Sequence, residues 1–321
     1  MSAPADLRGA GEDTAADPRP GATGRAWPSV TVVVPVHGDR GSLLLTARAL
    51  AAQDYPGAVD VVIADNGDNR DLQGALDALE VVSLVRETTP GSYAARNAAL
   101  LGARGDVIAF TDSDCVPTAH WLREAVGALL AAEEAGTGPC FVGGGVRLFC
   151  ADPARPTAAE LWDSLNFLRQ ERYVTVEGWA ATANMVVRRS TLDAVGAFDE
   201  RLKSGGDREW GERASRAGVR ALWCPAAEVA HPARRRMAEL HGKARRVTRG
   251  DVETRRRDGR PAFDPGVLRA SLNPALRSTV RRSGDLEVPS PRNRARYVAV
   301  TLWMRYYLLG AKALHAVRTA R

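Results

Sequence analysis

The sequence contains little cysteine and has no apolar leader. Its 321 residues include four cysteines, none of them in the CxxC spacing of a metal site, and four are too few for a disulfide scaffold. Residues 1–28 are rich in proline, glycine, alanine and charge, so we expect a disordered tail and no secretory signal peptide. These absences favour a reduced, cytoplasmic globular protein.

Charge is distributed unevenly along the chain. The whole sequence is 45% hydrophobic and 26% charged, which is ordinary for a globular protein, and its formal net charge is +6. Residues 1–231 hold 22 Lys+Arg and 31 Asp+Glu, or −9, whereas residues 232–321 hold 22 and 7, or +15. An acidic body therefore carries a basic tail, and the tail is predicted to contact an anionic surface.

Short apolar runs alternate with helical patterns through most of the body. The predicted strands are Val30–Val36, Val59–Ala64, Val81–Val85, Asp106–Phe110, Cys140–Phe149, Met185–Val187 and Val219–Trp223. This alternation predicts an α/β fold with a doubly wound, mostly parallel sheet and helices on both faces. Apolar spacing predicts one helix over Thr157–Arg172, and the triplet Gly143–Gly145 predicts a bulge or a close backbone approach.

Three regions follow from these patterns: a tail over residues 1–28, an α/β domain over 29–231 and an Arg-rich, mainly helical extension over 232–321. The extension ends in a predicted helix, Tyr297–Val317, in which Arg305 and Lys312 argue against a membrane span. Two interpretations remain open for this helix. It either lies at an anionic membrane surface beside the basic segment or packs on its own body.

The stretch GDVIAFTDSDCVP, residues 105–117, carries the first chemical signal. A buried strand ends at Asp112-Ser113-Asp114, and in an extended chain the two carboxylates would leave the same face, about 6–7 Å apart. Carboxylates at the carboxyl end of a central strand suit Mg²⁺ or Mn²⁺ bound together with a diphosphate. Asp65 ends the second strand, so we expect it beside this pair. The alternative is that Asp112 and Asp114 only cap a turn.

Six motifs in order resemble the family 2 inverting glycosyltransferases with the GT-A fold, over about residues 29–231. They are VTVVVPVHG, IADNGD, GSYAARNAAL, FTDSDC, ANMVVRRSTLDAVGAFDE and SGGDREWGERASRAG. The resemblance implies inverting transfer of a sugar from a nucleoside diphosphate to an acceptor hydroxyl. The expected setting is the biosynthesis of a cell-surface glycan, glycolipid or other glycoconjugate.

The resemblance also implies roles for individual residues. Asp65 would accept the imide N–H of a uracil-type base, which favours a UDP-sugar, and Pro35, Val36 and His37 would line the nucleoside pocket. Arg96 would lie near the diphosphate, and Asp112 and Ser113 would lie near the rest of the nucleotide. Asp114 would bind Mn²⁺ or Mg²⁺, with Asp112 and His231 as further ligands.

The late motif departs from the family pattern. Where the family usually has Glu-Asp, this sequence has Gly206-Asp207, followed by Glu209. Asp207 is then the predicted catalytic base, with Glu209 as the second candidate. The alternative is that both acids only offset the dipole of the helix that they begin.

Other functions fit the sequence less well. A sugar-nucleotide pyrophosphorylase needs a Gly-rich basic loop after the first strand, where this chain has PVHGDRGS. A nucleic-acid-binding protein is disfavoured by the acidic body and by the lack of recognition motifs in the tail. Retention of Asp114 and Asp207 argues against an inactive binding module. The expected partners are a nucleotide sugar, a hydroxyl acceptor that is lipid-linked or wall-associated, and an anionic membrane surface contacted by residues 232–321.

Overall fold

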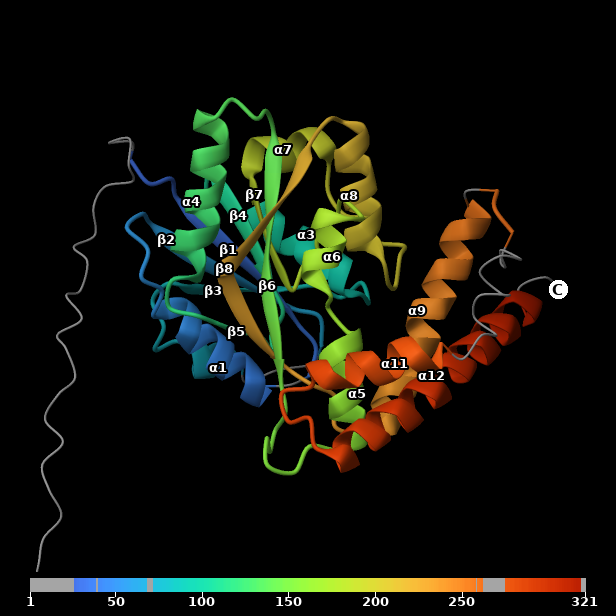
Figure 1. Cartoon of the computed structure of the whole chain (residues 1–321). Coiled ribbons are helices and arrows are strands. Elements are labelled where there is room, and N and C mark those ends of the chain that lie inside the picture. Colours follow the sequence, from blue (N-terminus) through green and yellow to red (C-terminus); the bar gives the residue numbers. More distant parts are fainter. Residues whose placement is uncertain (1–25, 39, 68–71, 258, 262–274, 319–321) are drawn as a thin grey trace, which may run out of the picture.

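The computed structural model describes residues 26–38, 40–67, 72–257, 259–261 and 275–318 (Figure 1). Four short parallel strands form one half of its sheet: β1 (Val30–Val36), β2 (Val59–Asp65), β3 (Val82–Arg86) and β4 (Val107–Thr111). Their order is β3-β2-β1-β4. Every residue of β1 and β4 is buried, as expected for parallel strands that helices cover on both faces.

The other half of the sheet is mixed. It contains β7 (Asn184–Arg188), β6 (Cys140–Phe149), β8 (Arg220–Pro232) and β5 (Val116–Pro117), in that order after β4. β7 lies antiparallel to both β4 and β6, β6 is parallel to β8, and β5 is antiparallel to β8. The predicted fold class, a mostly parallel α/β sheet, is confirmed.

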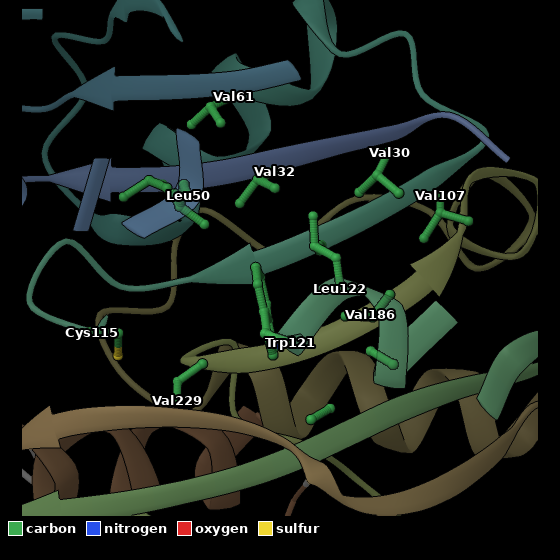
Figure 2. Close-up of a cluster of buried hydrophobic side chains, with 14 of the residues drawn as sticks. Val30, Val32, Leu50, Val61, Val107, Cys115, Trp121, Leu122, Val186 and Val229 are labelled. Carbon is green, nitrogen blue, oxygen red and sulfur yellow. The ribbon is translucent and has the colours of Figure 1, made fainter. Parts of the chain in front are cut away.

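Helices cover the two faces of the sheet. One face carries α1 (Arg40–Ala51), α2 (Leu72–Leu76) and α4 (Trp121–Glu134), and the other carries α3 (Ser92–Gly102), α7 (Arg189–Val195) and α8 (Gly206–Arg216). Alternate residues of β1 divide between the two cores, as the period of a strand requires. Figure 2 shows the first core, where Trp121 and Leu122 pack among valines of the sheet.

Asn184, the first residue of β7, is a buried polar residue that joins three segments. Its Oδ1 accepts a hydrogen bond from Nε1 of Trp121 at 2.8 Å. Its Nδ2 donates to the carbonyl oxygens of Gly145 and Ala227 at 2.7 and 2.8 Å. Because buried donors and acceptors without partners are costly, this side chain fixes β6 and β8 relative to α4.

The glycine triplet in β6 makes the predicted close approach. A Cβ at Gly144 would collide with the carbonyl of Ala227 and with the amide of Asn184. The register between β6 and β8 shifts between Gly144 and Val146, so the bulge is also confirmed. Beyond the shift, Leu148 pairs with His231.

The prediction of one helix over Thr157–Arg172 is wrong. Two helices are present, α5 (Ala158–Asn166) and α6 (Gln170–Thr175), and Leu168 between them has φ of 43°. The apolar spacing continues through the break because both helices contact apolar neighbours, so the pattern did not reveal it. Because of the break, Phe167 lies outside both helices, immediately after the end of α5.

The extension after residue 232 is helical, as predicted, and packs on the body. Its described part contains α9 (Met237–Arg257), α11 (Leu276–Arg282), the short 3₁₀ helix η1 (Ser283–Asp285) and α12 (Pro291–Arg318). Figure 1 shows α9 and α12 side by side, next to α5. A small core joins these three helices, formed by Ala159, Leu240, Ala244, Val300 and Met304.

Packing changes the interpretation of the last helix. Lys312, which argued against a membrane span, forms an ion pair with Asp251 of α9, and its side chain is only 15% exposed. The self-packing alternative is therefore correct for this face of α12. Among the described helices, none combines the length and the apolar character that crossing a bilayer requires.

The body begins slightly before residue 29. The ring of Trp27 meets Tyr55 edge to face, with 5.4 Å between centroids, and the hydroxyl of Tyr55 donates to the carbonyl oxygen of Pro28 at 2.6 Å. Most of the predicted tail, residues 1–25, lies outside the described residues.

Candidate functional site

The site is built around the turn that follows β4. The amide of Cys115 donates to the carbonyl oxygen of Asp112 at 3.1 Å, which closes a turn and not the extended chain assumed from the sequence. Thr46 of α1 holds this turn in place, because its Oγ1 lies within hydrogen-bond distance of the carbonyl oxygens of Ser113 and Cys115, at 2.9 and 2.7 Å. Ser113 contributes its backbone to this support, and its side chain is partly exposed.

The turn gathers potential ligand atoms within a small space. Atoms of Asp112, Asp114, Cys115 and His231 all lie within 4.8 Å of one another. His231 arrives from β8, which pairs with the short strand β5 immediately after the turn. The structure therefore brings together all three predicted metal ligands, although His231 is distant from the aspartates in sequence.

The orientation of His231 suits a cation. Its Nδ1 lies 2.8 Å from the carbonyl oxygen of Pro232, which can only accept, so Nδ1 carries the proton. The lone pair of Nε2 then faces Oδ1 of Asp114 at 3.6 Å. Two acceptors that face each other are stabilised by a proton or a metal ion between them, and a backbone carbonyl on the second nitrogen is typical of metal-binding histidines.

The two aspartates suit a hard divalent ion better than the thiol does. Burial raises the pKa of Cys115 well above its ordinary value, and the charges of Asp112 and Asp114 raise it further, so the thiol stays protonated. Carboxylate oxygens and one imidazole fit Mn²⁺ or Mg²⁺. Cys115 is therefore a neighbour of the donor set and not a member of it.

Burial has the largest effect on the pKa of the Asp114 carboxyl. Burial raises the pKa of its carboxyl, and the negative charge of Asp112 acts in the same direction. The charge of Arg234 acts in the opposite direction without cancelling the rise. A bound divalent cation would favour the charged form of this carboxylate.

Two side chains of α3 connect Asp112 with Asp207. Arg96 is 4% exposed, and its NH2 group lies 2.5 Å from Oδ1 of Asp112. One helical turn earlier, the hydroxyl of Tyr93 donates to Oδ1 of Asp207 at 3.2 Å and accepts from the amide of Gly206 at 2.8 Å. Arg96 is therefore buried against a carboxylate. Sequence reasoning missed Tyr93, although its three-residue spacing from Arg96 places both on one face of α3.

The glycines before Asp207 are required by the local geometry. Gly205 has φ of 81°, a conformation that favours glycine, and it begins α8. A Cβ at Gly206 would lie 2.7 Å from the ring of Tyr93. Tyr93 thus packs against the position where related sequences carry the first acid, which accounts for the missing carboxylate.

Burial raises the pKa of Asp207, and this effect outweighs the charge of Arg96 and the hydrogen bonds from Arg208 and Tyr93, which lower it. From the sequence, only the helix N-terminus was considered, and that favours the charged form. A carboxylate with a raised pKa binds a proton more strongly, which suits proton abstraction.

Glu209 lies in a different environment. Both of its oxygens approach Arg213, at 2.9 and 3.3 Å, and Arg213 also donates to the carbonyl oxygens of Val195 and Ala197. This ion pair joins α8 to the end of α7. Glu209 is thus engaged in a structural contact, unlike Asp207.

The predicted nucleoside residues lie along the same sheet edge, but not beside the aspartate pair. Because β1 separates β2 from β4, Asp65 lies two strands from Asp112, about 10 Å by strand spacing. These carboxylates therefore share one edge of the sheet, with the end of β1 between them. Asp65 is buried, and its Oδ1 accepts from the amide of Gly67 at 3.0 Å.

Pro35 and Val36 have buried side chains, whereas His37 is exposed, with its Nδ1 2.8 Å from the carbonyl oxygen of Asn66. Of these three predicted pocket residues, only His37 and the backbone are available to line an open pocket.

Comparison with known proteins decides the family. The model of glycosyl transferase family 2 matches residues 31–196. The chain is also 33% identical to the glycosyltransferase AglE of Haloferax volcanii over 234 residues, which is 70% of this chain and 74% of AglE. This chain belongs to glycosyl transferase family 2. It is therefore a glycosyltransferase, and the predicted pyrophosphorylase alternative is excluded.

Other matches agree with this assignment. The pre-mycofactocin glycosyltransferase of Mycobacterium tuberculosis is 30% identical over 236 residues, which are 70% of this chain but only 47% of that longer protein. The mannosyltransferase PcManGT of Pyrobaculum calidifontis, solved with GDP-Man and Mn²⁺, superposes with a TM-score of 0.60 at 22% identity, over 91% of this chain and 88% of its own. GalNAc-T7, solved with UDP, GalNAc and Mn²⁺, gives a TM-score of 0.50 at 16% identity, over 69% of this chain and 48% of the GalNAc-T7 chain. These structures confirm the GT-A fold.

The raised pKa of Asp207 generates a stability prediction. A carboxyl with a higher pKa in the folded state binds its proton more tightly there, so stability falls as pH rises from the ordinary 3.8 through the raised value. Asparagine does not titrate. Asp207→Asn should therefore increase the free energy of unfolding at neutral pH, and the gain should disappear below about pH 3.8. Urea denaturation across pH measures this difference.

Asp199→Asn provides a control of opposite sign. A hydrogen bond from Arg201 lowers the pKa of Asp199, so this substitution should reduce stability at neutral pH. Equal stability of Asp207→Asn and the wild type at every pH would contradict the prediction.

Proposed function

We propose that this chain is an inverting, divalent-metal-dependent glycosyltransferase that moves a sugar from a nucleoside diphosphate to an acceptor hydroxyl. The observation that carries the proposal is the 3.6 Å approach of Nε2 of His231 to Oδ1 of Asp114, with Asp112 beside them. An imidazole nitrogen and carboxylate oxygens placed so close together can bind a cation between them. Asp207, held by Tyr93, then provides a separate carboxylate for proton transfer.

Asp114 and His231 would hold Mn²⁺ or Mg²⁺, with the second oxygen of Asp112 as a further ligand. When bound, the ion would supply Lewis-acid neutralisation of the charge that develops on the departing diphosphate. Arg96 occupies one oxygen of Asp112 and orients it. Arg96 therefore acts as a positioning residue, in addition to bringing positive charge to the nucleotide side of the site.

Asp207 would act as the general base. It takes the proton of the acceptor hydroxyl while the oxygen bonds to the anomeric carbon from the face opposite the diphosphate. The bond between sugar and diphosphate breaks, and its electron pair leaves with the diphosphate, so the configuration inverts. The hydroxyl of Tyr93 fixes one oxygen of Asp207 and leaves the other for the acceptor.

A uridine donor is favoured by Asp65. Its carboxylate ends β2 on the nucleotide side of the sheet edge, where it can accept the imide N–H of uracil. PcManGT was solved with the guanine nucleotide GDP-Man, and GalNAc-T7 was solved with the uracil nucleotide UDP. The fold alone therefore does not determine which base is bound. The preference rests on this one carboxylate and the exposed His37.

An anionic bilayer is the proposed location of the acceptor, which would be lipid-linked or wall-associated in the biosynthesis of a cell-surface glycoconjugate. One side of α12 exposes Trp303, Tyr306, Leu314 and Val317, each about half exposed or more, although Nε1 of Trp303 also donates to Nε2 of His241 in α9 at 2.8 Å. At 100° per residue these four fall within about 80° of the helix circumference. An apolar stripe of this kind within a segment of charge +15 is typical of an interfacial helix.

Asp114→Asn should abolish metal-dependent binding of nucleotide. With Mn²⁺ or Mg²⁺, nucleotide sugars should raise the melting temperature of the wild type, because a ligand that binds only the folded state stabilises it. EDTA should remove this effect. Asp106→Asn, just before the same strand, should behave as the wild type. Normal binding and transfer by Asp114→Asn in EDTA would disprove the metal assignment.

Asp207→Asn should abolish transfer, with a loss of about 10²–10⁴-fold in kcat, because that is the usual contribution of a general base. Its affinity for nucleotide diphosphate and metal should stay close to that of the wild type. Glu209→Gln should have a smaller effect, since Glu209 pairs with Arg213. Steady-state kinetics with an active donor and acceptor test both variants, and the reverse ranking would exchange their roles.

Replacing the apolar stripe should release the protein from anionic vesicles. Wild-type protein should co-sediment with vesicles increasingly as the anionic lipid fraction rises, and Trp303→Ser with Leu314→Ser should reduce this binding. Leu101→Ser, which removes an exposed leucine from α3, is the control. Deletion of residues 232–321 is less suitable, because it would uncover the buried side of α5. Binding that is independent of lipid charge would contradict the proposal.

A further inference from the structure

Helix α9 closely approaches the loop that leads to Asp207. A Cβ on Gly250 would lie 2.9 Å from the carbonyl oxygen of Ser204, so the helix backbone lies directly against this loop. Further along, Arg257 forms an ion pair with Asp199 at 3.2 Å. The C-terminal extension therefore forms part of the active-site surroundings.

Lys243 is the side chain that α9 directs toward the site. Its Nζ is buried, lies over the ring of Phe167 and has no hydrogen-bond partner among the described residues. Phe167 in turn meets the ring of His231 edge to face, with 5.5 Å between centroids. The guanidinium of Arg234 lies over the same Phe167 ring at 4.2 Å. Two cationic side chains thus contact Phe167, and Phe167 contacts His231, the proposed metal ligand.

Positive charge in this place is not balanced. The buried carboxylate of Asp163 is engaged by Arg234, through the backbone amide at 2.9 Å and the guanidinium at 3.1 Å. Burial lowers the pKa of Lys243 well below its ordinary value, and Arg234 and Arg246 lower it further. Asp163 and Asp207 oppose this shift without offsetting it. A buried ammonium that lacks a hydrogen-bonded counter-charge and lies beside a second cation is unfavourable unless an anion joins it.

The position indicates which anion fits. The charge of Asp207 acts on the pKa of Lys243, and the charge of Arg234 acts on the pKa of Asp114, so the two cations lie near the proposed base and the proposed metal ligand. The cluster therefore lies between the proposed base and the proposed metal ligands. A phosphoryl group has several acceptor oxygens and can accept from an ammonium and a guanidinium at the same time.

We infer that Lys243, together with Arg234, forms a phosphoryl-binding subsite that the C-terminal extension contributes to the active site. The inference rests on the proposed function, since it assumes that phosphoryl groups enter this site. Two sources share this chemistry: the diphosphate of the donor, and a phosphate carried by the acceptor next to its reacting hydroxyl. In either case the basic extension serves substrate binding directly.

Lys243→Met tests the subsite, because methionine keeps the apolar stem and removes the ammonium. Calorimetric titration should compare this variant with the wild type in two arms. The first arm measures UDP and GDP with MnCl₂. The second measures inorganic phosphate, with and without saturating nucleotide diphosphate and Mn²⁺. Arg249→Met, which removes an exposed charge from the same helix, is the matched control.

At least one arm should weaken by about tenfold or more in Lys243→Met, since bonds to charged groups have that size. Weaker nucleotide diphosphate binding assigns the subsite to the donor. Phosphate binding to nucleotide-loaded wild type that is lost in the variant assigns it to the acceptor. Lys243→Arg should retain part of the affinity, and the melting temperature of Lys243→Met should not fall, because an unpaired buried charge is removed.

Unchanged affinity of Lys243→Met in both arms would overturn the inference. That result is distinct from failure of the proposed function, in which the wild type itself would not bind nucleotide diphosphate with Mn²⁺. The phosphate arm without nucleotide still tests the subsite in that case.

Discussion

Negative charge crowded at the end of β4 is the constraint on which the surrounding structure depends. Carboxylates removed from water need hydrogen bonds or opposite charge. Arg96 of α3 supplies charge to Asp112, and His231 of β8 lies against Asp114 with its lone pair toward the carboxylate oxygen. Thr46 fixes the turn that carries both acids. Elements far apart in the chain are therefore positioned by one electrostatic requirement.

The same principle explains how the extension is attached. The difference between an acidic body and a basic tail suggested an external anionic partner, but part of the charge is used within the molecule. Arg234 pairs with the buried Asp163, Arg235 lies 3.7 Å from the buried Glu160, and Arg257 pairs with Asp199. Together with the apolar core between α5, α9 and α12, these pairs hold the extension on the body. The ammonium of Lys243, which has no hydrogen-bond partner among the described residues, lies beside the proposed active site.

The departure from the family pattern before Asp207 has a steric explanation. In this chain Tyr93 reaches across from α3, binds the amide of Gly206 and packs its ring where a side chain at that position would lie. A glutamate could not occupy position 206 without moving the tyrosine. The tyrosine hydroxyl in turn holds Asp207. Loss of one carboxylate and gain of a hydrogen bond to the other are thus two consequences of the same contact.

The sequence by itself determined most of the strands, the fold class and the carboxylates at the sheet edge. The strand predicted over Val219–Trp223 is β8, which continues to Pro232, and β5 was not predicted. β1 and β6 have the predicted limits, because runs of apolar and β-branched residues between turn signals depend mainly on local preference and burial. Tertiary structure decided what lies next to those carboxylates. The break after α5 that frees Phe167, the separation of Asp65 from Asp112 by β1, and the approach of Lys243 could not be predicted, because each depends on packing between segments distant in the chain. Local patterns specify which face of an element is buried, but not which partner covers it.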